Sequence, residues 1–212
     1  MKIDTSNLLN SIQENLANVD FLTSSDIPNI DLYMDQVTSF MEKELASTKR
    51  SEEDKILTKT MINNYAKGNL LPAPIKKKYS KEHLLVLIFI YYFKNILTMK
   101  DIETLLTPIT DKYFHTDSDI TIADIYDEIY NFKEEHNDII QKDILAMYEQ
   151  STKVFLNVAD EERESLQLFS LICTLCLDVY VKKMLIESLI DQIPSKKEEE
   201  PVKEKKKKEK EK

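Results

Sequence analysis

Glycine is almost missing from this chain of 212 residues, which contains one, Gly68. Average usage of about 7% would give roughly fifteen. A P-loop, a Rossmann phosphate turn and a nucleophile elbow each need glycine, where the backbone takes a positive φ or approaches a ligand closely. The sequence therefore excludes these three kinds of site. Few tight hairpin turns can form either, so we expect a helical protein.

Cysteine is also scarce, and the chain's two cysteines form the sequence Cys173-Thr174-Leu175-Cys176. Such a pair is compatible with redox chemistry or with half of a zinc site. A structural zinc needs four ligands, however, and neither a second cysteine pair nor a histidine is near in the sequence. We predict no metal and no cofactor, and interpret both cysteines as small apolar residues buried in a helix.

Long apolar segments are missing too. The two longest runs, Leu84 to Phe93 and Leu166 to Leu177, fall short of the roughly 20 residues that span a bilayer. The first twenty residues include Asp4, Glu14 and Asp20 and do not read as a signal peptide. We therefore expect a cytoplasmic protein that has no membrane partner.

Signals of catalysis are few. His83, His115 and His136 are far apart in the sequence and show no HExxH or other clustered ligand spacing, so we expect core or surface roles for them. The sequence does not identify a set of catalytic residues made of a nucleophile, a base and a group that orients the base. We predict that the protein is not an enzyme, and the alternative requires carboxylates that only the fold brings together.

Charge is distributed unevenly behind the net charge of −9. Residues 49–83 contain nine basic and four acidic side chains, whereas residues 84–194 contain nine basic and twenty acidic ones. Nucleic-acid sites are built from local basic patches of this kind. An ordinary solvated surface remains the alternative. Residues 195–212 consist of Lys and Glu apart from one Ser, one Pro and one Val, which predicts a disordered tail because nothing in it can be buried.

The N-terminal half shows helical periodicity. A helix is predicted from Asn29 or Asp31 to about Leu45, and its apolar stripe begins at Tyr33 and should face a core. A polar stretch from Ala46 to Ile56 reads as a flexible connector. Thr58 can then cap a short helix that Gly68 and Asn69 end, since both residue types tolerate the left-handed conformation.

Further helices follow in the C-terminal direction. Ser80 caps an apolar helix over 81–96, Thr98 and Asp101 open another that Pro108 closes, and one helix is predicted over 121–148 with a possible break near His136 or Asn137. The last helix, over 161–193, is apolar on most faces. Such a helix must be enclosed, either in the centre of its own domain or across a dimer interface.

Three segments of the chain form a pattern when they are read together: Thr58-Lys59-Thr60-Met61-Ile62-Asn63-Asn64-Tyr65-Ala66-Lys67-Gly68-Asn69-Leu70-Leu71-Pro72, Tyr79-Ser80-Lys81-Glu82-His83-Leu84 and Leu97-Thr98-Met99-Lys100-Asp101-Ile102. They resemble the winged-helix pattern of the MerR type, in which a capped recognition helix is followed by Gly-Leu-Leu-Pro, a wing and a Tyr-Ser start of a core helix. This chain departs from the pattern with Asn63-Asn64-Tyr65 in place of Arg-Tyr-Tyr and with a shorter wing that has Lys for Arg. Together with the segment from Ile27 to Val37, the chain also resembles the bacterial family called domain of unknown function 1836, which brings no activity with it.

The MerR-type resemblance implies that the helix over 58–67 enters the major groove of duplex DNA, where Asn63 or Asn64 pairs with adenine. Lysines and the Tyr65 hydroxyl would hold phosphates. The implied DNA-contacting residues are Lys59, Thr60, Asn63, Asn64, Tyr65, Lys67, Lys76, Lys77 and Lys78.

These observations predict an all-α protein in three parts. Residues 1–112 form a MerR-like winged-helix domain with a recognition-type helix at about 58–67 and a short wing at 69–79, residues 113–194 form a helical dimerisation or sensing domain, and residues 195–212 form the charged tail. The predicted function is that of a transcriptional regulator that binds duplex DNA. A homodimer is also expected, and the sequence identifies neither the effector nor whether DNA is bound by the dimer. The alternative is a helical protein-interaction module that has a winged-helix shape and does not bind DNA.

Overall fold

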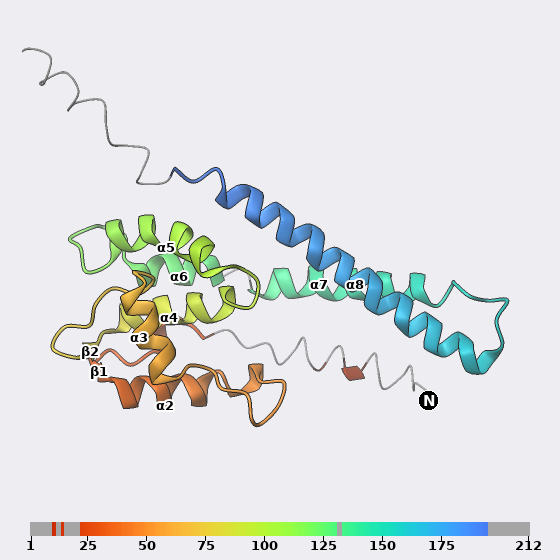
Figure 1. Ribbon diagram of the computed structural model, residues 1–212, viewed down its shortest axis with the longest axis horizontal. Helices are drawn as coiled ribbons and strands as arrows, with labels where there is room; N and C mark the ends of the chain where they lie inside the picture. The colour runs from red at the N-terminus through yellow and green to blue at the C-terminus, as the bar shows by residue number, and fades with distance from the viewer. Residues whose placement is uncertain (1–9, 12–13, 15–21, 131–132, 195–212) are drawn as a thin grey trace, which may run out of the picture.

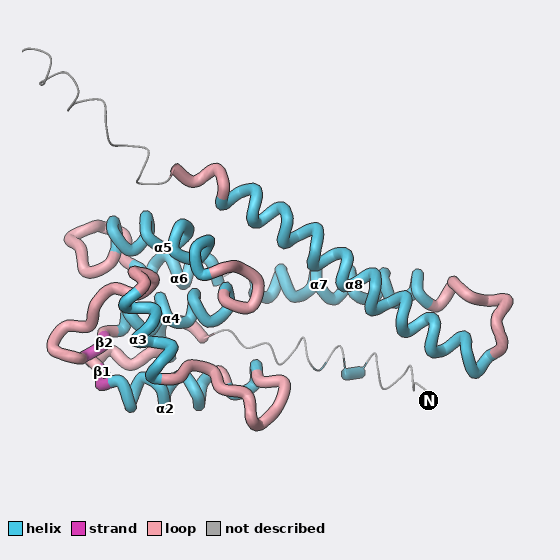
Figure 2. Tube along the Cα trace, in the orientation of Figure 1, coloured by secondary structure: helices cyan, strands magenta, loops and turns pink. Residues whose placement is uncertain are grey.

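The computed structural model describes residues 10, 11, 14, 22–130 and 133–194; the predicted tail lies outside them. The described part is mostly helical, which confirms the all-α prediction, and Figure 2 shows two short strands among the helices. Residues 22–130 form a body, and two long helices form an arm that extends from it (Figure 1).

The body begins with a small sheet. Strand β1 (Leu32–Tyr33) pairs antiparallel with β2 (Lys78–Tyr79), and α2 follows β1 directly as Met34–Glu44. The prediction that this helix starts at Asn29 or Asp31 is wrong, because Leu32 and Tyr33 are paired in the sheet. Tyr33 consequently lies outside the apolar stripe of α2 and is 55% exposed.

The segment between α2 and α3 (Lys59–Lys67) is held in place, which corrects the prediction of a flexible connector. It forms a short 3-10 helix (Ala46–Thr48), and Lys49 makes an ion pair with Glu42 of α2. Lys94 donates a hydrogen bond to the carbonyl oxygen of Ile56 at 2.8 Å. Ile56 and Leu57 are buried, so this segment is part of the core.

Helix α4 (Lys81–Phe93) is the centre of the body. Every residue from His83 to Tyr91 is buried, because α6, β2 and the remaining elements of the body surround the helix. Helix α4 ends three residues before the predicted position, and Lys94 is its C-cap.

Helix α5 (Met99–Tyr113) begins as predicted with a capping box between Thr98 and Asp101. It does not end at Pro108, which lies inside it. Proline removes one backbone hydrogen bond in a helix. The apolar residues after Pro108, Ile109 and Tyr113, pack against the core, and this burial outweighs that cost.

The core of the body extends beyond the domain boundary predicted after residue 112. Helix α6 (Ile122–Tyr130) packs against α4 and adds Ile122 and Tyr126 to the same core cluster. The Asp127 carboxylate also accepts hydrogen bonds from the backbone and hydroxyl of Ser24, at the start of the body. The body is therefore one unit that spans residues 22–130.

The arm consists of α7 (Lys133–Ser151) and α8 (Asp160–Ile190), which pack side by side and are joined by a turn at the far end (Figure 1). His136 and Asn137 are helical, so the possible break does not occur there. The C-terminal end of α8 returns to the body, where Ile190 is buried in the core. No helix in the described part of the chain combines the length and the apolar character that crossing a membrane requires.

The central position of α4 can be tested by truncating one of its side chains. Leu87 has no exposed surface, so Leu87→Ala should leave a cavity and lower the free energy of unfolding by about 3 kcal/mol. Urea denaturation measures this change. Ile30→Ala is the control, because Ile30 is 67% exposed and its truncation should change stability by less than about 0.5 kcal/mol. Equal effects would contradict the central role of α4.

Candidate nucleic-acid interface

Helix α3 (Lys59–Lys67) has one polar face and one buried face. Thr58 caps it as predicted, with its hydroxyl accepting a hydrogen bond from the backbone N–H of Met61 at 3.2 Å. Ile62 and Tyr65 are buried against the core and hold the helix in a fixed orientation. The exposed residues of α3 are Lys59, Thr60, Asn63, Asn64 and Lys67, as the sequence pattern predicts.

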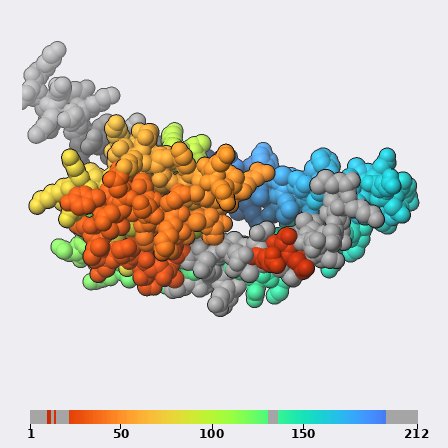
Figure 3. Space-filling model, turned by 90° about the horizontal axis from the view of Figure 1, so that it is seen from below, coloured from red at the N-terminus to blue at the C-terminus, as the bar shows by residue number. Residues whose placement is uncertain are grey.

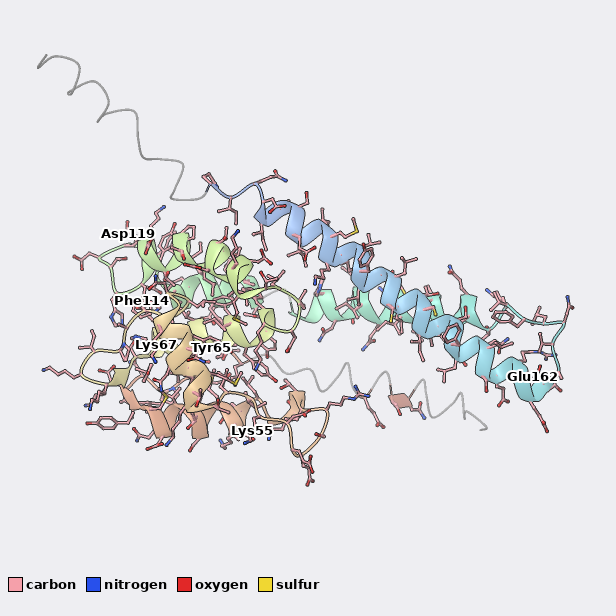
Figure 4. All side chains as sticks on the ribbon, viewed as in Figure 1. Lys55, Tyr65, Lys67, Phe114, Asp119 and Glu162 are labelled. Atoms are coloured by element: carbon pink, nitrogen blue, oxygen red, sulfur yellow. The ribbon has the colours of Figure 1, made fainter. Side chains whose placement is uncertain are left out.

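Tyr65 is turned inward, although the MerR-type resemblance implied that its hydroxyl holds a phosphate. Tyr65 is 6% exposed, and burial raises its pKa. Figure 4 labels Tyr65 and Lys67 on α3. A residue buried in the core does not reach a phosphate in solution, so Tyr65 anchors the helix instead and is removed from the candidate contact set.

At the C-terminal end of α3, Gly68 and Asn69 take different backbone conformations. Gly68 was predicted to take the left-handed conformation together with Asn69, but Gly68 has φ −91° and Asn69 alone has a positive φ, 58°. A Cβ atom added at Gly68 would come within 3.1 Å of Leu70 Cδ1 and 3.2 Å of the Asn64 carbonyl oxygen. A side chain at position 68 would therefore be crowded, whereas the φ of Gly68 is one that any residue can adopt.

The predicted wing is a tight hairpin whose tip is made of lysine. The backbone N–H of Lys78 donates to the Ile75 carbonyl oxygen at 2.9 Å, and both central residues, Lys76 and Lys77, have positive φ, 51° and 64°. Two consecutive positive φ values define a type I′ turn, which prefers Asn-Gly. Lysine at these positions is strained, and strain of this kind concentrates at functional sites.

The lysines of this region differ in their exposure and in their contacts with other side chains. Lys76 and Lys77 are exposed at the hairpin tip, whereas Lys78 is half-buried and its Nζ lies 5.3 Å from the centre of the Tyr33 ring. Lys59 makes an ion pair with Asp35 of α2. Because Asp35 already neutralises part of its charge, Lys59 offers less to a phosphate than Lys67, Lys76 and Lys77 do.

A histidine cluster at the base of the hairpin was missed by the sequence reasoning, which treated the histidines as separate. Ser80 caps α4, its backbone N–H donates to Nδ1 of His83 at 3.0 Å, and its hydroxyl also lies 2.9 Å from Nε2 of His115. Glu82 Oε2 accepts from the backbone N–H of His115 at 2.8 Å. The His83 ring contacts Tyr79 of β2 and Phe114 edge-on. The cluster therefore ties the hairpin to the C-terminal end of α5.

This cluster has the geometry of a structural cap. Glu82 Oε2 approaches His115 at Nε2, 3.3 Å away, which is the same nitrogen that the Ser80 hydroxyl contacts. A catalytic triad instead places the carboxylate on the other ring nitrogen. Among the described residues, no three His, Cys, Asp or Glu side chains come together as a metal site.

A cavity of about 490 Å³ lies between the end of α3, the start of the hairpin and α5. The carboxylates Glu103 and Asp111 line it beside Phe114 and several small or apolar residues. Carboxylates repel phosphate, so this cavity is a poor site for a polyanion. The lining residues are Ala66, Asn69, Leu71, Pro72, Ala73, Glu103, Thr107, Thr110, Asp111 and Phe114.

The cysteine pair lies on the arm, far along the chain from this interface. Both Cys173 and Cys176 are free and exposed, which corrects the prediction that they are buried. The prediction failed because it assumed that α8 is enclosed, whereas much of its apolar surface faces outward.

The strain at the hairpin tip predicts that a sequence suited to the turn will be more stable. The double substitution Lys76→Asn with Lys77→Gly should raise the free energy of unfolding by about 1 kcal/mol, because Asn and Gly tolerate positive φ. Urea denaturation measures the gain. The same substitution at the exposed Lys182 and the half-buried Lys183 of α8 should destabilise, since glycine disfavours a helix. A loss of stability at the hairpin would contradict the type I′ geometry.

His83 predicts a pH dependence of stability. Burial lowers its pKa from 6.5 to about 4, against an opposing effect of the Ala73 backbone. Between about pH 6.5 and pH 4 the unfolded chain therefore binds a proton that the folded protein does not, and stability falls as pH falls. This contribution is about 1 kcal/mol per pH unit within that window and vanishes above it.

The variant His83→Gln isolates this effect, because glutamine at this position can still accept the hydrogen bond from the Ser80 backbone and cannot be protonated. Its denaturation midpoint should fall less than that of the unmodified protein between pH 6.5 and pH 4. His136→Gln is the control, since His136 is exposed. Parallel pH profiles for the unmodified protein and His83→Gln would refute a buried neutral imidazole.

Comparisons with known proteins agree with the extent of the body. The comparison with curated proteins and the comparison with solved structures each found no match. A family model does match, over residues 22–129, which is the span of the body almost to its last residue. The chain belongs to the family described as Domain of unknown function (DUF1836).

Proposed function

We propose that the protein binds duplex DNA through the polar face of α3 and the lysine tip of the hairpin, and that it acts as a transcriptional regulator. The main support for the proposal is that residues 59–78 combine three properties. This segment is basic within an acidic chain, its polar side chains are exposed on a helix that is anchored from behind, and it ends in a strained lysine turn.

The order of elements in the body supports a winged-helix arrangement. Strand β1 precedes α2, α2 packs against α3, and the hairpin after α3 returns β2 to pair with β1. A helix-turn-helix unit places its second helix in the major groove while the first crosses the backbone. In this proposal α3 is the second helix, α2 is the first, and the hairpin is the wing.

The residue types of the exposed face suit this placement. Asn63 and Asn64 carry amides, which pair with the N6 and N7 atoms of adenine. Lys67 and the tip lysines Lys76 and Lys77 supply free positive charge for phosphates. The N-terminal end of α3 is the weaker part of the surface, because Asp35 holds Lys59.

The proposal is tested by fluorescence anisotropy of labelled mixed-sequence duplex DNA over a salt titration that begins at low salt. Affinity should fall steeply with salt, because phosphate contacts release counterions. Lys76→Glu with Lys77→Glu should weaken binding by roughly tenfold or more and reduce the slope of log K against log salt by about 2. These two residues are exposed, so folding should be preserved.

Lys142→Glu with Lys153→Glu is the matched control, since it makes the same change in net charge at two exposed lysines of the arm region. The control should bind DNA with nearly the affinity and salt slope of the unmodified protein. Equal losses in the two variants would show that only net charge matters. That result, or no binding at low salt, would refute the DNA-binding proposal.

A further inference from the structure

Helix α8 has large apolar side chains on several of its sides that the described chain does not cover. Of its residues, Leu171 and Ile190 are the buried ones, whereas nine large apolar side chains are 48% to 64% exposed. Exposed patches beyond a few hundred Å² mark interaction sites. The nine residues are Phe169, Ile172, Leu177, Val179, Tyr180, Val181, Met184, Leu185 and Leu189.

Five of these residues share one face of α8, since at 100° per residue Phe169, Ile172, Val179, Tyr180 and Met184 fall within about 140° of one another. At these exposures each side chain offers on the order of 100 Å², so the five offer about 500 Å² toward the roughly 800 Å² per partner of a standard interface. Figure 3 shows the arm, in cyan to blue, extending beyond the body, so that another chain can lie along it.

A narrow stripe within this face is complementary to itself. At 100° per residue, its members lie within roughly 100° of one another around the helix. When two copies of the stripe are set antiparallel, each residue of one copy comes opposite a residue of complementary charge or size in the other. Glu162 comes opposite Lys183, Ser165 opposite Tyr180, and Phe169 opposite Cys176. The stripe is Glu162, Ser165, Phe169, Ile172, Cys173, Cys176, Tyr180 and Lys183.

We propose that α8 pairs antiparallel with α8 of a second copy of this chain, about a two-fold axis that passes between Ile172 and Cys173. A two-fold interface must be complementary to itself, and this register meets that condition at every position of the stripe. A parallel pairing instead sets the acidic first turn, Asp160 to Glu162, against the same turn of the second copy. The proposal does not depend on DNA binding.

The two exposed cysteines can distinguish this antiparallel register from a parallel pairing, because the two arrangements allow different disulfides between the copies. With a rise of 1.5 Å per residue, the Cys173 residues of the two copies lie about 1.5 Å apart along the axis, and the Cys176 residues about 10 Å apart. A disulfide requires Cα atoms within about 7 Å. Two copies in this register can therefore be joined through Cys173 and not through Cys176, whereas a parallel pair can be joined through either.

The first experiment measures the mass of the full chain in solution by light scattering after size-exclusion chromatography. The expected mass is that of a dimer, and Phe169→Glu should raise the dissociation constant by roughly tenfold or more, because it places a charge in the apolar centre of the interface. Ile30→Glu is the matched control on an exposed apolar residue of the body and should remain dimeric. A monomer at tens of micromolar, or a dimer that Phe169→Glu leaves unchanged, would overturn the proposal.

The second experiment exchanges charges at the ends of the stripe. Glu162→Lys and Lys183→Glu should each weaken the dimer, because each creates like charges across the interface, and the double variant should recover the affinity of the unmodified chain. The recovery separates a pairing effect from a folding effect, since Lys183 also makes an ion pair with Glu187 of its own helix. Additive losses in the double variant would refute the register.

The third experiment is mild oxidation, followed by electrophoresis without reductant. Cys176→Ser should still give a covalent dimer and Cys173→Ser should not. A covalent dimer of Cys173→Ser would show a parallel pairing or another register and would overturn the proposal. None of these readouts involves DNA, so failure here and failure of the DNA-binding proposal are distinguishable.

Discussion

The burial of α4 on all its faces is the constraint on which the rest of the body depends. A helix that is apolar all round is stable in water only when other elements surround it. Helices α5 and α6 and strand β2 each turn apolar residues toward this helix, and α3 adds Ile62 and Tyr65 to the same core. The orientation of α3 follows from this packing. Because its anchoring residues face the core, the polar face on the opposite side of the helix faces the solvent.

The hairpin depends on the same helix through its first turn. Ser80 is both the residue after β2 and the cap of α4, so the end of the hairpin and the start of the central helix are one feature. His83 completes the cap as a neutral ring packed between Tyr79 and Phe114. The position of the tip lysines therefore rests on a buried imidazole, and a charge on that ring works against the packing of the hairpin base.

Local signals predicted part of this structure and long-range contacts decided the rest. The caps at Thr58, Ser80 and Thr98 and the two faces of α3 follow from neighbouring residues, and they were predicted from the sequence. Strand β1 was missed because Leu32 and Tyr33 are extended only through pairing with residues 78 and 79. The helix beyond Pro108 and the contact of Ser80 with His115 were missed for the same reason, since distant residues supply their stabilisation.

The two most apolar helices predicted from the sequence, α4 and α8, differ in how much of their surface the described chain covers. Helix α4 finds its partners inside the body, whereas α8 touches the body at its C-terminal end and α7 along one side. Helix α8 contains more charged residues than α4, but its exposed apolar side chains favour a partner from outside the described chain in the same way. A self-complementary stripe at this surface makes a second copy the simplest occupant. In the proposed pairing the stripe on α8 contains no residue of α3 or the hairpin, so a dimer of this kind would have two copies of the proposed DNA-binding surface.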